Sequence, residues 1–138
     1  MIDAIVLAAG ASRRMGEPKA LCDLSGTRVV DRILSTLERI GIVSPKLVLA
    51  QPHGPAIADF IASSRRFSVE IRWNPQPEQG MLSSIQCGLF AIPTSAEGAL
   101  LWPVDVPLVR PETIENILSH DRRQWLVPTF QDRGGHPI

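Results

Sequence analysis

Several features that would assign this chain to a broad class are missing from it. It contains two cysteines, Cys22 and Cys87, and no Cys/His cluster with the spacing of a zinc site. The cysteines lie far apart, so we expect free thiols in a reducing cytoplasm rather than a structural disulfide. No apolar run is long enough to span a membrane, and Asp3 interrupts the first one. We therefore expect neither a membrane partner nor a signal peptide.

Charge of one sign is also missing. Lysine and arginine together number 14, as do aspartate and glutamate, so the formal net charge is zero. A general nucleic-acid-binding protein carries a basic face, and we therefore expect no nucleic-acid partner. Lysine itself is scarce, because Lys19 and Lys46 are the only two. The 138 residues contain no internal repeat or linker, which predicts a single domain over residues 1–138.

The most informative segment follows the first apolar run, Ile2–Leu7, which predicts a buried strand. This segment combines small residues with three cations: Gly10, Ser12, Gly16, Arg13, Arg14 and Lys19. A loop of small residues after a strand exposes backbone N–H groups, and the cations add fixed positive charge. Both are what a polyphosphate requires. The segment therefore predicts a nucleoside triphosphate at the C-terminal end of the first strand.

Two common phosphate-binding motifs do not fit this segment. A Walker A loop needs four residues between its glycines and a lysine after the second, but five residues separate Gly10 from Gly16, and Glu17 follows. A dinucleotide fingerprint needs Gly-x-Gly-x-x-Gly, which Ala11-Ser12 breaks. Neither a P-loop kinase nor a nicotinamide dehydrogenase is therefore expected.

Short apolar runs alternate with segments of helical period, which predicts an α/β fold with a mostly parallel sheet and helices on both faces. The predicted strands are Ile2–Leu7, Lys46–Ala50, Ser68–Arg72, Gly98–Trp102 and Trp125–Phe130. The predicted helices cover residues 29–40, 55–64, 81–92 and a segment that begins at Pro111. Such sheets bind ligands at their C-terminal edge. Residues 131–138 read as a turn into a further strand, so we expect that the chain lacks the C-terminal portion of its fold.

Asp105 directly follows the predicted strand Gly98–Trp102, between Pro103 and Pro107, which restrict the backbone. A carboxylate held at the ligand edge of a parallel sheet is a suitable Mg²⁺ ligand, because Mg²⁺ takes one or two carboxylates together with phosphate oxygens. The alternative is an aspartate that only caps a turn.

The segment 74–85 joins a strand to a helix. Gly80 would permit close approach of a ligand, and the hydroxyls of Ser83 and Ser84 could reach a base or ribose. Ordinary N-capping by either serine is the competing interpretation. His136 lies in a Gly-Gly-His-Pro turn, where a histidine is more often structural than catalytic, and we expect no role for His53.

Four motifs resemble the MobA-like nucleotidyltransferases, in that family's order. They are Leu7-Ala8-Ala9-Gly10-x-Ser12-x-Arg14-Met15-Gly16-x-x-Lys19, Gly80-Met81-x-x-Ser84-Ile85-x-x-Gly88-Leu89, Asp105-x-Pro107-Leu108 and Gly135-His136-Pro137. The resemblance implies a Rossmann-like three-layer nucleotidyltransferase fold. It is greatest to the molybdenum cofactor cytidylyltransferases, which transfer CMP from CTP to molybdopterin. Guanylyltransferases typically have glycine where this chain has Ala9, so cytidine is favoured.

The resemblance also implies roles for individual residues. The backbone of Ala8, Ala9, Gly10 and Ser12 would hold the nucleotide, and Gly80 and Ser84 would line its pocket. Arg14 would bind the β- and γ-phosphates, and Lys19 would contact the α-phosphate. Asp105 would hold Mg²⁺, and His136 would lie beside the acceptor.

Two departures from the family pattern keep alternatives open. Residues Trp102-Pro103-Val104 precede Asp105, where the cytidylyltransferases usually have a glycine, and family members continue beyond the Gly-His-Pro motif. The alternatives are transfer from GTP or another NTP to a different phosphorylated acceptor, and a nucleotide-binding module without turnover. A fold without any ligand is a third possibility.

Overall fold

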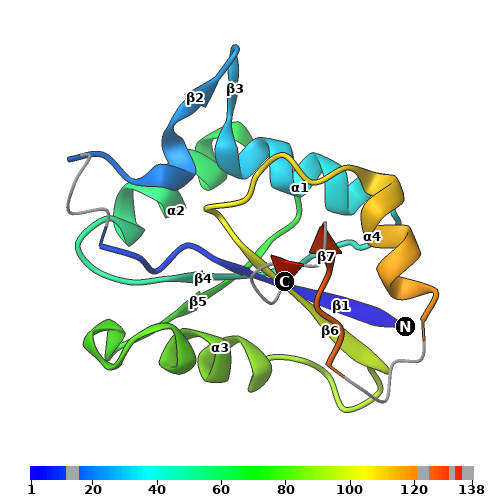
Figure 1. The fold of residues 1–138 in the computed structure, drawn as a ribbon. Helices are drawn as coiled ribbons and strands as arrows, with labels where there is room; N and C mark the ends of the chain where they lie inside the picture. Colours follow the sequence, from blue (N-terminus) through cyan, green and yellow to red (C-terminus); the bar gives the residue numbers. More distant parts are fainter. Residues whose placement is uncertain (12–15, 121–124, 131–132, 135–138) are drawn as a thin grey trace.

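The structure is a computed structural model that describes residues 1–11, 16–120, 125–130 and 133–134. Its centre is a four-stranded sheet of β1 (Ile2–Leu7), β4 (Lys46–Leu49), β5 (Glu70–Trp73) and β6 (Gly98–Pro103). The strand order is β5-β4-β1-β6, and all three pairings are parallel. The predicted α/β class is therefore confirmed. In Figure 1 strand β1 runs from right to left, so the C-terminal edge of the sheet lies on the left.

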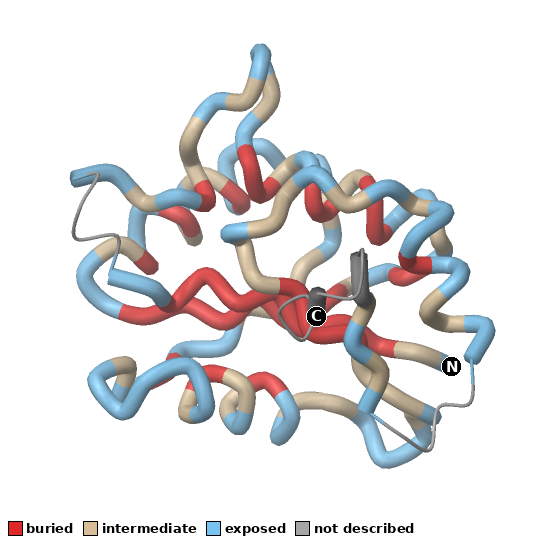
Figure 2. Tube along the Cα trace, in the orientation of Figure 1, coloured by how far each residue is buried: buried red, intermediate tan, exposed pale blue. Residues whose placement is uncertain are grey.

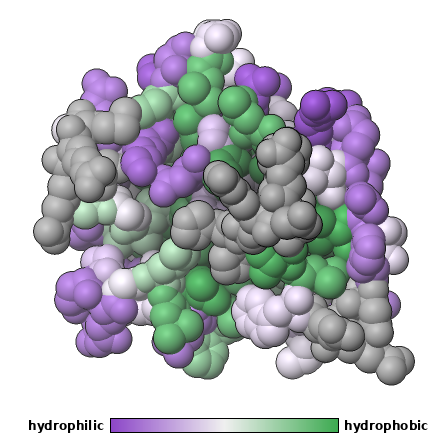
Figure 3. All heavy atoms as spheres, viewed as in Figure 1, coloured by the Kyte–Doolittle hydropathy of each residue, from purple (hydrophilic) through white to green (hydrophobic). Residues whose placement is uncertain are grey.

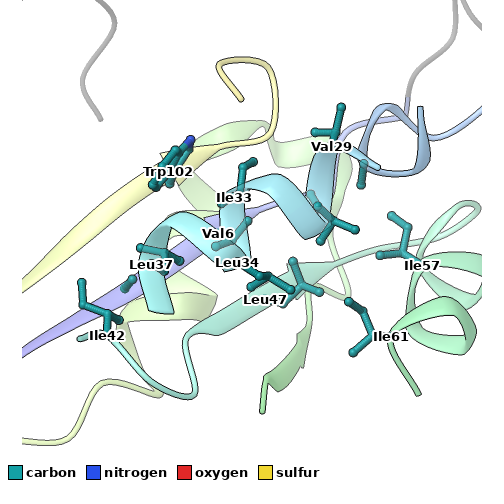
Figure 4. Packing of buried hydrophobic residues seen from close by; sticks show 14 of the residues in the cluster. Val6, Val29, Ile33, Leu34, Leu37, Ile42, Leu47, Ile57, Ile61 and Trp102 are labelled. Atoms are coloured by element: carbon teal, nitrogen blue, oxygen red, sulfur yellow. The ribbon is translucent and has the colours of Figure 1, made fainter. Parts of the chain in front are cut away.

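Helices cover both faces of this sheet. Helices α1 (Val29–Arg39), α2 (Gly54–Ser64) and α4 (Pro111–Leu118) lie on one face, and α3 (Met81–Leu89) lies on the other (Figure 1). The larger core cluster joins α1 and α2 to the sheet through Ile33, Leu37 and Ile57, with the fully buried Trp102 of β6 (Figure 4). Figure 2 shows that burial concentrates in the strands and on the sides of the helices that face them. This is the three-layer arrangement that the alternating pattern predicts.

Gly88 of helix α3 packs directly against Ile5 of β1. A Cβ atom at this position would lie 2.4 Å from Cγ2 of Ile5, which is fully buried in β1. No side chain larger than hydrogen fits there unless the sheet or the helix moves. The glycine therefore sets the distance between α3 and the sheet, and with it the position of the N-terminus of α3.

The helix boundaries agree with the sequence pattern in most places. Helix α1 ends before Gly41, whose φ of +80° lets Ile42 N–H return to the carbonyl of Leu37. Helix α3 ends at Leu89, three residues earlier than predicted, and Ala91 and Ile92 continue in tighter i→i+3 turns. Neither Ser83 nor Ser84 caps α3, because its N-cap is Gly80 and no side-chain cap bond forms.

The sequence does not predict the other short elements, and the last predicted strand is much shorter in the structure. Strands β2 (Asp23–Leu24) and β3 (Thr27–Arg28) form a hairpin through Ser25 and Gly26, which both have positive φ, as in a type I′ turn. Two 3₁₀ turns, η1 (Lys19–Leu21) and η2 (Pro77–Gln79), precede this hairpin and α3. The predicted strand Trp125–Phe130 is reduced to β7 (Thr129–Phe130), which pairs with β8 (Arg133–Gly134).

A buried ion pair lies at the N-terminal edge of the sheet. Lys46 Nζ lies 2.9 Å from Asp3 Oδ2 and 3.1 Å from Glu70 Oε2, and Lys46 and Asp3 are each 7% exposed. Burial alone lowers the pKa of Lys46, but hydrogen bonds and charge from Asp3 and Glu70 outweigh it, so the pKa is raised. Lys46, one of the two lysines, therefore has a structural role in the folded core. No helix in the described part of the chain is long and apolar enough to cross a membrane.

Candidate functional site

A cavity of about 590 Å³ opens at the C-terminal edge of the sheet. Its walls come from segments that follow β1, β4 and β6 and from the start of α3, and they include Ala9, Gly10, Gln51, Gly80, Ser84 and Asp105. Small-molecule sites commonly have volumes of roughly 300–1,000 Å³. Figure 3, viewed as in Figure 1 with the C-terminal edge on the left, shows hydrophilic residues at the η2 end of α3 and hydrophobic residues farther along it. The cavity is large enough for a nucleotide.

The first wall is the end of β1 and the loop after it. Ala8 N–H donates to the carbonyl of Val48 at 2.9 Å, so the ladder extends one residue past the strand. Ala8 and Ala9 are buried, whereas Gly10 and Ala11 are exposed. The chain therefore leaves the sheet at Gly10, where its backbone borders the cavity. Ser12 and Arg14, which belong to the same predicted phosphate loop, lie outside the described residues.

Lys19 is carried on the 3₁₀ turn η1. This turn is anchored by Ala20, which is 1% exposed, and by Cys22 N–H, which donates to the carbonyl of Lys19 at 3.1 Å. The side chain of Lys19 remains 45% exposed. A buried alanine beside an exposed lysine fixes the backbone while the ammonium group remains accessible to a ligand.

Asp105 is held in a turn directly after β6. Val106 N–H donates to the carbonyl of Pro103 at 3.3 Å, and the buried indole of Trp102 donates to the carbonyl of Val106 at 3.0 Å. The carboxylate is thereby presented at the edge of the cavity, where Oδ1 accepts a hydrogen bond from Lys19 Nζ at 3.0 Å. Two residues that the sequence predicts to act together are therefore in contact.

The small number of carboxylates in the cavity limits the kind of metal site that it can form. Among the described residues, no group of three or more His, Cys, Asp or Glu side chains could enclose a metal ion. Asp105 and Glu78 are the acidic residues among the cavity-lining residues that the structure describes. One or two carboxylates at an open cavity fit Mg²⁺ that completes its coordination with phosphate oxygens and water, and do not fit a closed structural site.

Gly80 and Ser84 form the wall on the α3 side. Gly80 has φ +85° and ψ −172°, a conformation that only glycine adopts readily. Ser84 is 6% exposed, and its hydroxyl accepts a hydrogen bond from Asn74 Nδ2 at 2.9 Å. Both residues line the cavity, as their predicted role requires. His136, the predicted acceptor-side residue, lies outside the described residues.

His53 has a contact that the sequence did not indicate. Its Nε2–H donates to the carbonyl of Ala11 at 2.9 Å and so ties the loop after β1 to the N-terminus of α2. A carbonyl oxygen can only accept, so Nε2 carries the proton. The two residues are 42 positions apart, and no spacing rule connects them.

Comparisons with known proteins identify the family and relatives of this chain. A family model described as "MobA-like NTP transferase domain" matches residues 4–138. The bifunctional protein GlmU of Halorhodospira halophila is 31% identical over 135 residues, which cover 96% of this chain and 27% of that protein. A probable molybdenum cofactor guanylyltransferase of Natranaerobius thermophilus is 29% identical over 125 residues, which cover 90% of this chain and 57% of that protein.

Solved structures give the same result for the fold. Rv0371c from Mycobacterium tuberculosis H37Rv superimposes with a TM-score of 0.79 at 25% identity, covering 99% of this chain and 68% of that one. The same mycobacterial protein has been solved as a complex with manganese, with a TM-score of 0.58 and coverage of 85% and 57%. The chain spans less than two thirds of the length of either curated relative.

Proposed function

Since the chain belongs to the MobA-like NTP transferase family, we propose that it is a Mg²⁺-dependent nucleotidyltransferase that transfers CMP from CTP to the phosphate of molybdopterin. The observation that carries this proposal is the contact between Lys19 and Asp105 at 3.0 Å on the rim of the cavity. A cation and a carboxylate at the C-terminal edge of a parallel sheet are the groups that a metal-bound triphosphate requires. We treat residues 1–138 as one nucleotidyltransferase domain, located in the cytoplasm.

The proposed roles follow from where charge changes during the reaction. A phosphate oxygen of the acceptor attacks the α-phosphorus of CTP, and the bond from that phosphorus to the bridging oxygen breaks, releasing pyrophosphate. Lys19 neutralises charge on the α-phosphate, and Arg14 neutralises charge on the departing pyrophosphate. Asp105 would hold Mg²⁺, which supplies further positive charge to the phosphate oxygens. Loss of one such group should slow transfer by roughly 100- to 1,000-fold.

The remaining site residues position the nucleotide and the acceptor. The backbone of Ala8, Ala9, Gly10 and Ser12 would surround the base and phosphates, and Gly80 and Ser84 would contact the base or ribose. His136 would lie beside the acceptor. No nucleic-acid or membrane partner is required by this reaction.

The choice of CTP depends on Ala9, which stands where guanylyltransferases typically have glycine. One observation favours a second candidate, transfer from GTP, because a relative that is 29% identical is named a probable guanylyltransferase. Another NTP with a different phosphorylated acceptor, or nucleotide binding without turnover, are the further alternatives.

Calorimetric titration with Mg²⁺ and each of the four common NTPs distinguishes these candidates. The proposal predicts that CTP binds most tightly, and that molybdopterin then triggers release of pyrophosphate. Tightest binding of GTP would favour the guanylyl alternative. Tight binding of CTP without pyrophosphate release would favour a module without turnover, and no binding of any NTP would contradict the proposed function.

A further inference from the structure

A buried asparagine that does not line the cavity connects three of its supporting segments. Asn74 follows β5 and is 5% exposed, and its N–H donates to the carbonyl of Leu49 at the end of β4 at 2.8 Å. Its side-chain amide contacts both the loop before η2 and the first turns of α3. Every polar group of this side chain is therefore used.

The orientation of this amide is fixed by a backbone group. Gln76 N–H donates to Asn74 Oδ1 at 2.9 Å. An amide rotated by half a turn would place Nδ2 against this N–H, donor against donor, and a backbone N–H cannot accept. Nδ2 therefore faces the two serines, and it donates to Ser83 Oγ at 2.8 Å and to Ser84 Oγ at 2.9 Å.

The hydroxyl groups of Ser83 and Ser84 differ in whether they have an acceptor for their own proton. Ser83 Oγ donates within the loop, to the carbonyl of Gly80 at 2.8 Å or that of Gln76 at 3.1 Å. Ser84 Oγ accepts from Asn74 and has no acceptor for its own proton among the described residues. Ser84 also lines the cavity, whereas Ser83 is not among the lining residues. The proton of Ser84 is therefore available to a ligand.

We propose that Asn74 is a positioning residue that sets the polarity of Ser84, so that the cavity presents a hydrogen-bond donor at this point. The Ser84 proton then favours an acceptor on the nucleotide, such as a carbonyl, ring nitrogen or ribose oxygen, because an amino group there would leave that proton without an acceptor. This inference deepens the proposed function and rests on it. Without Asn74 the hydroxyl could turn back to the carbonyl of Gly80, one helical turn earlier, as serines in helices often do.

The test is a double-mutant cycle on Asn74 and Ser84, with the affinity for CTP in the presence of Mg²⁺ as the readout. Asn74→Asp keeps the acceptor for Gln76 N–H but, when ionised, removes both donors, so the Ser84 hydroxyl must donate to the carboxylate. The titrations are run well above the ordinary pKa of aspartate. Asn74→Ala is the second variant, and Ser83→Ala is the matched control, because it loses one bond to the same amide without altering the cavity wall. The melting temperature of each variant without nucleotide reports its folding.

The expected result is that Ser84→Ala and Asn74→Asp each weaken CTP binding about tenfold, the value of one hydrogen bond. In the Ser84→Ala background, either Asn74 variant should change the affinity by less than about threefold, because the group it positions is already absent. Ser83→Ala should retain the wild-type affinity.

Two results overturn this inference. Multiplicative effects of the two substitutions, about a hundredfold in the double variant, would contradict action through Ser84. Equal loss of affinity in Ser83→Ala and Asn74→Asp would indicate that Asn74 only stabilises the loop. In both cases wild-type binding would leave the proposed function intact. A wild-type chain that binds no NTP would overturn the proposed function and, with it, this inference.

Discussion

Lys19 and Asp105 are 86 positions apart in the sequence, and their side chains meet at 3.0 Å on the rim of the cavity. Each is carried by a turn anchored in the core, Lys19 by η1 beside the buried Ala20 and Asp105 by the turn that Trp102 closes. Their side chains are 45% and 60% exposed. An ion pair this exposed contributes little to folding, about 0–1 kcal/mol. The location of this ion pair on the rim of the cavity is therefore better explained by ligand binding than by a contribution to the stability of the fold.

Substitution of either residue should therefore weaken ligand binding while it leaves the stability of the fold nearly unchanged. We expect Lys19→Met and Asp105→Asn to change the free energy of unfolding by no more than about 1 kcal/mol, as measured by chemical denaturation. Both should weaken the binding of CTP in the presence of Mg²⁺, measured by calorimetry. The control is Arg39→Met, which removes an exposed cation in the last turn of α1. An equal loss of affinity in the control would indicate a general effect of net charge.

Lys46, the other lysine, should behave in the opposite way. Lys46→Met leaves Asp3 buried without its cation, and we expect a loss of about 3 to 5 kcal/mol in the free energy of unfolding. Adding Asp3→Asn to this variant should restore part of the loss, because the buried carboxylate is then removed. Full stability of Lys46→Met in urea denaturation would contradict the assignment of this pair to the folded core.

The pH dependence of stability should contain opposing contributions. The hydrogen bond from Lys46 lowers the pKa of Glu70 below 4.5 despite partial burial, so its stabilisation is present above 4.5 and is lost as pH falls through the folded pKa. Burial raises the pKa of Asp31 above 3.8, although Arg66 and Arg28 oppose the shift. For Asp31 the folded state holds the proton more strongly, so stability falls as pH rises through the folded pKa.

Asp31→Asn isolates the second contribution. Asp31 Oδ1 is buried without a hydrogen-bond partner among the described residues, so the charged form is disfavoured. The variant should be more stable than wild type at neutral pH, and this gain should shrink at a pH below 3.8, where both folded and unfolded aspartate are protonated. Melting temperatures across this range test it, and a gain that is independent of pH would contradict it.

Gly88→Ala should destabilise the fold by about 1 to 3 kcal/mol, because the added methyl group meets Ile5 in a fully packed core. Gly10→Ala is the comparison for stability, since a Cβ atom at Gly10 meets nothing within 4 Å. Combining Gly88→Ala with Ile5→Ala should cost less than the sum of the two single changes, because the smaller residue makes room. Strict additivity in thermal denaturation would show that the two residues do not compete for the same space.

The sequence predicted the parts of the fold that rest on strong local patterns. Strand β1 is an apolar run that only Asp3 interrupts, and α1 repeats apolar residues at helical spacing, so the sequence predicts both at nearly the correct bounds. The two-residue strands β2 and β3 are too short to leave a periodic pattern. The predicted third helix extends to Ile92 because Pro93 is the first residue that must stop it, whereas α3 ends at Leu89.

For the site as well, residues within a local sequence motif can be predicted, and residues whose role depends on contacts between distant segments cannot. The sequence predicts Lys19 and Asp105 because each belongs to a recognisable motif that follows a strand. It does not predict a role for Asn74 or His53, because their contacts depend on how separate loops pack, and Asn74 precedes a proline in a segment that the sequence marks only as a loop. The roles of such residues can be inferred only when the burial and the remaining hydrogen-bonding groups of the residues that they contact are known.

The central claim is that the cavity at the C-terminal edge of the sheet binds a metal–triphosphate complex. Amide NMR spectra of the ¹⁵N-labelled chain, recorded with CTP and with Mn²⁺ in place of Mg²⁺, test it most directly, because the paramagnetic ion broadens nearby signals. The account predicts broadening of Gly10, Gly80 and Asp105 while Lys46 and Glu70 at the opposite edge stay sharp. Broadening at the opposite edge, or the same pattern with Mn²⁺ whether or not CTP is present, would contradict it.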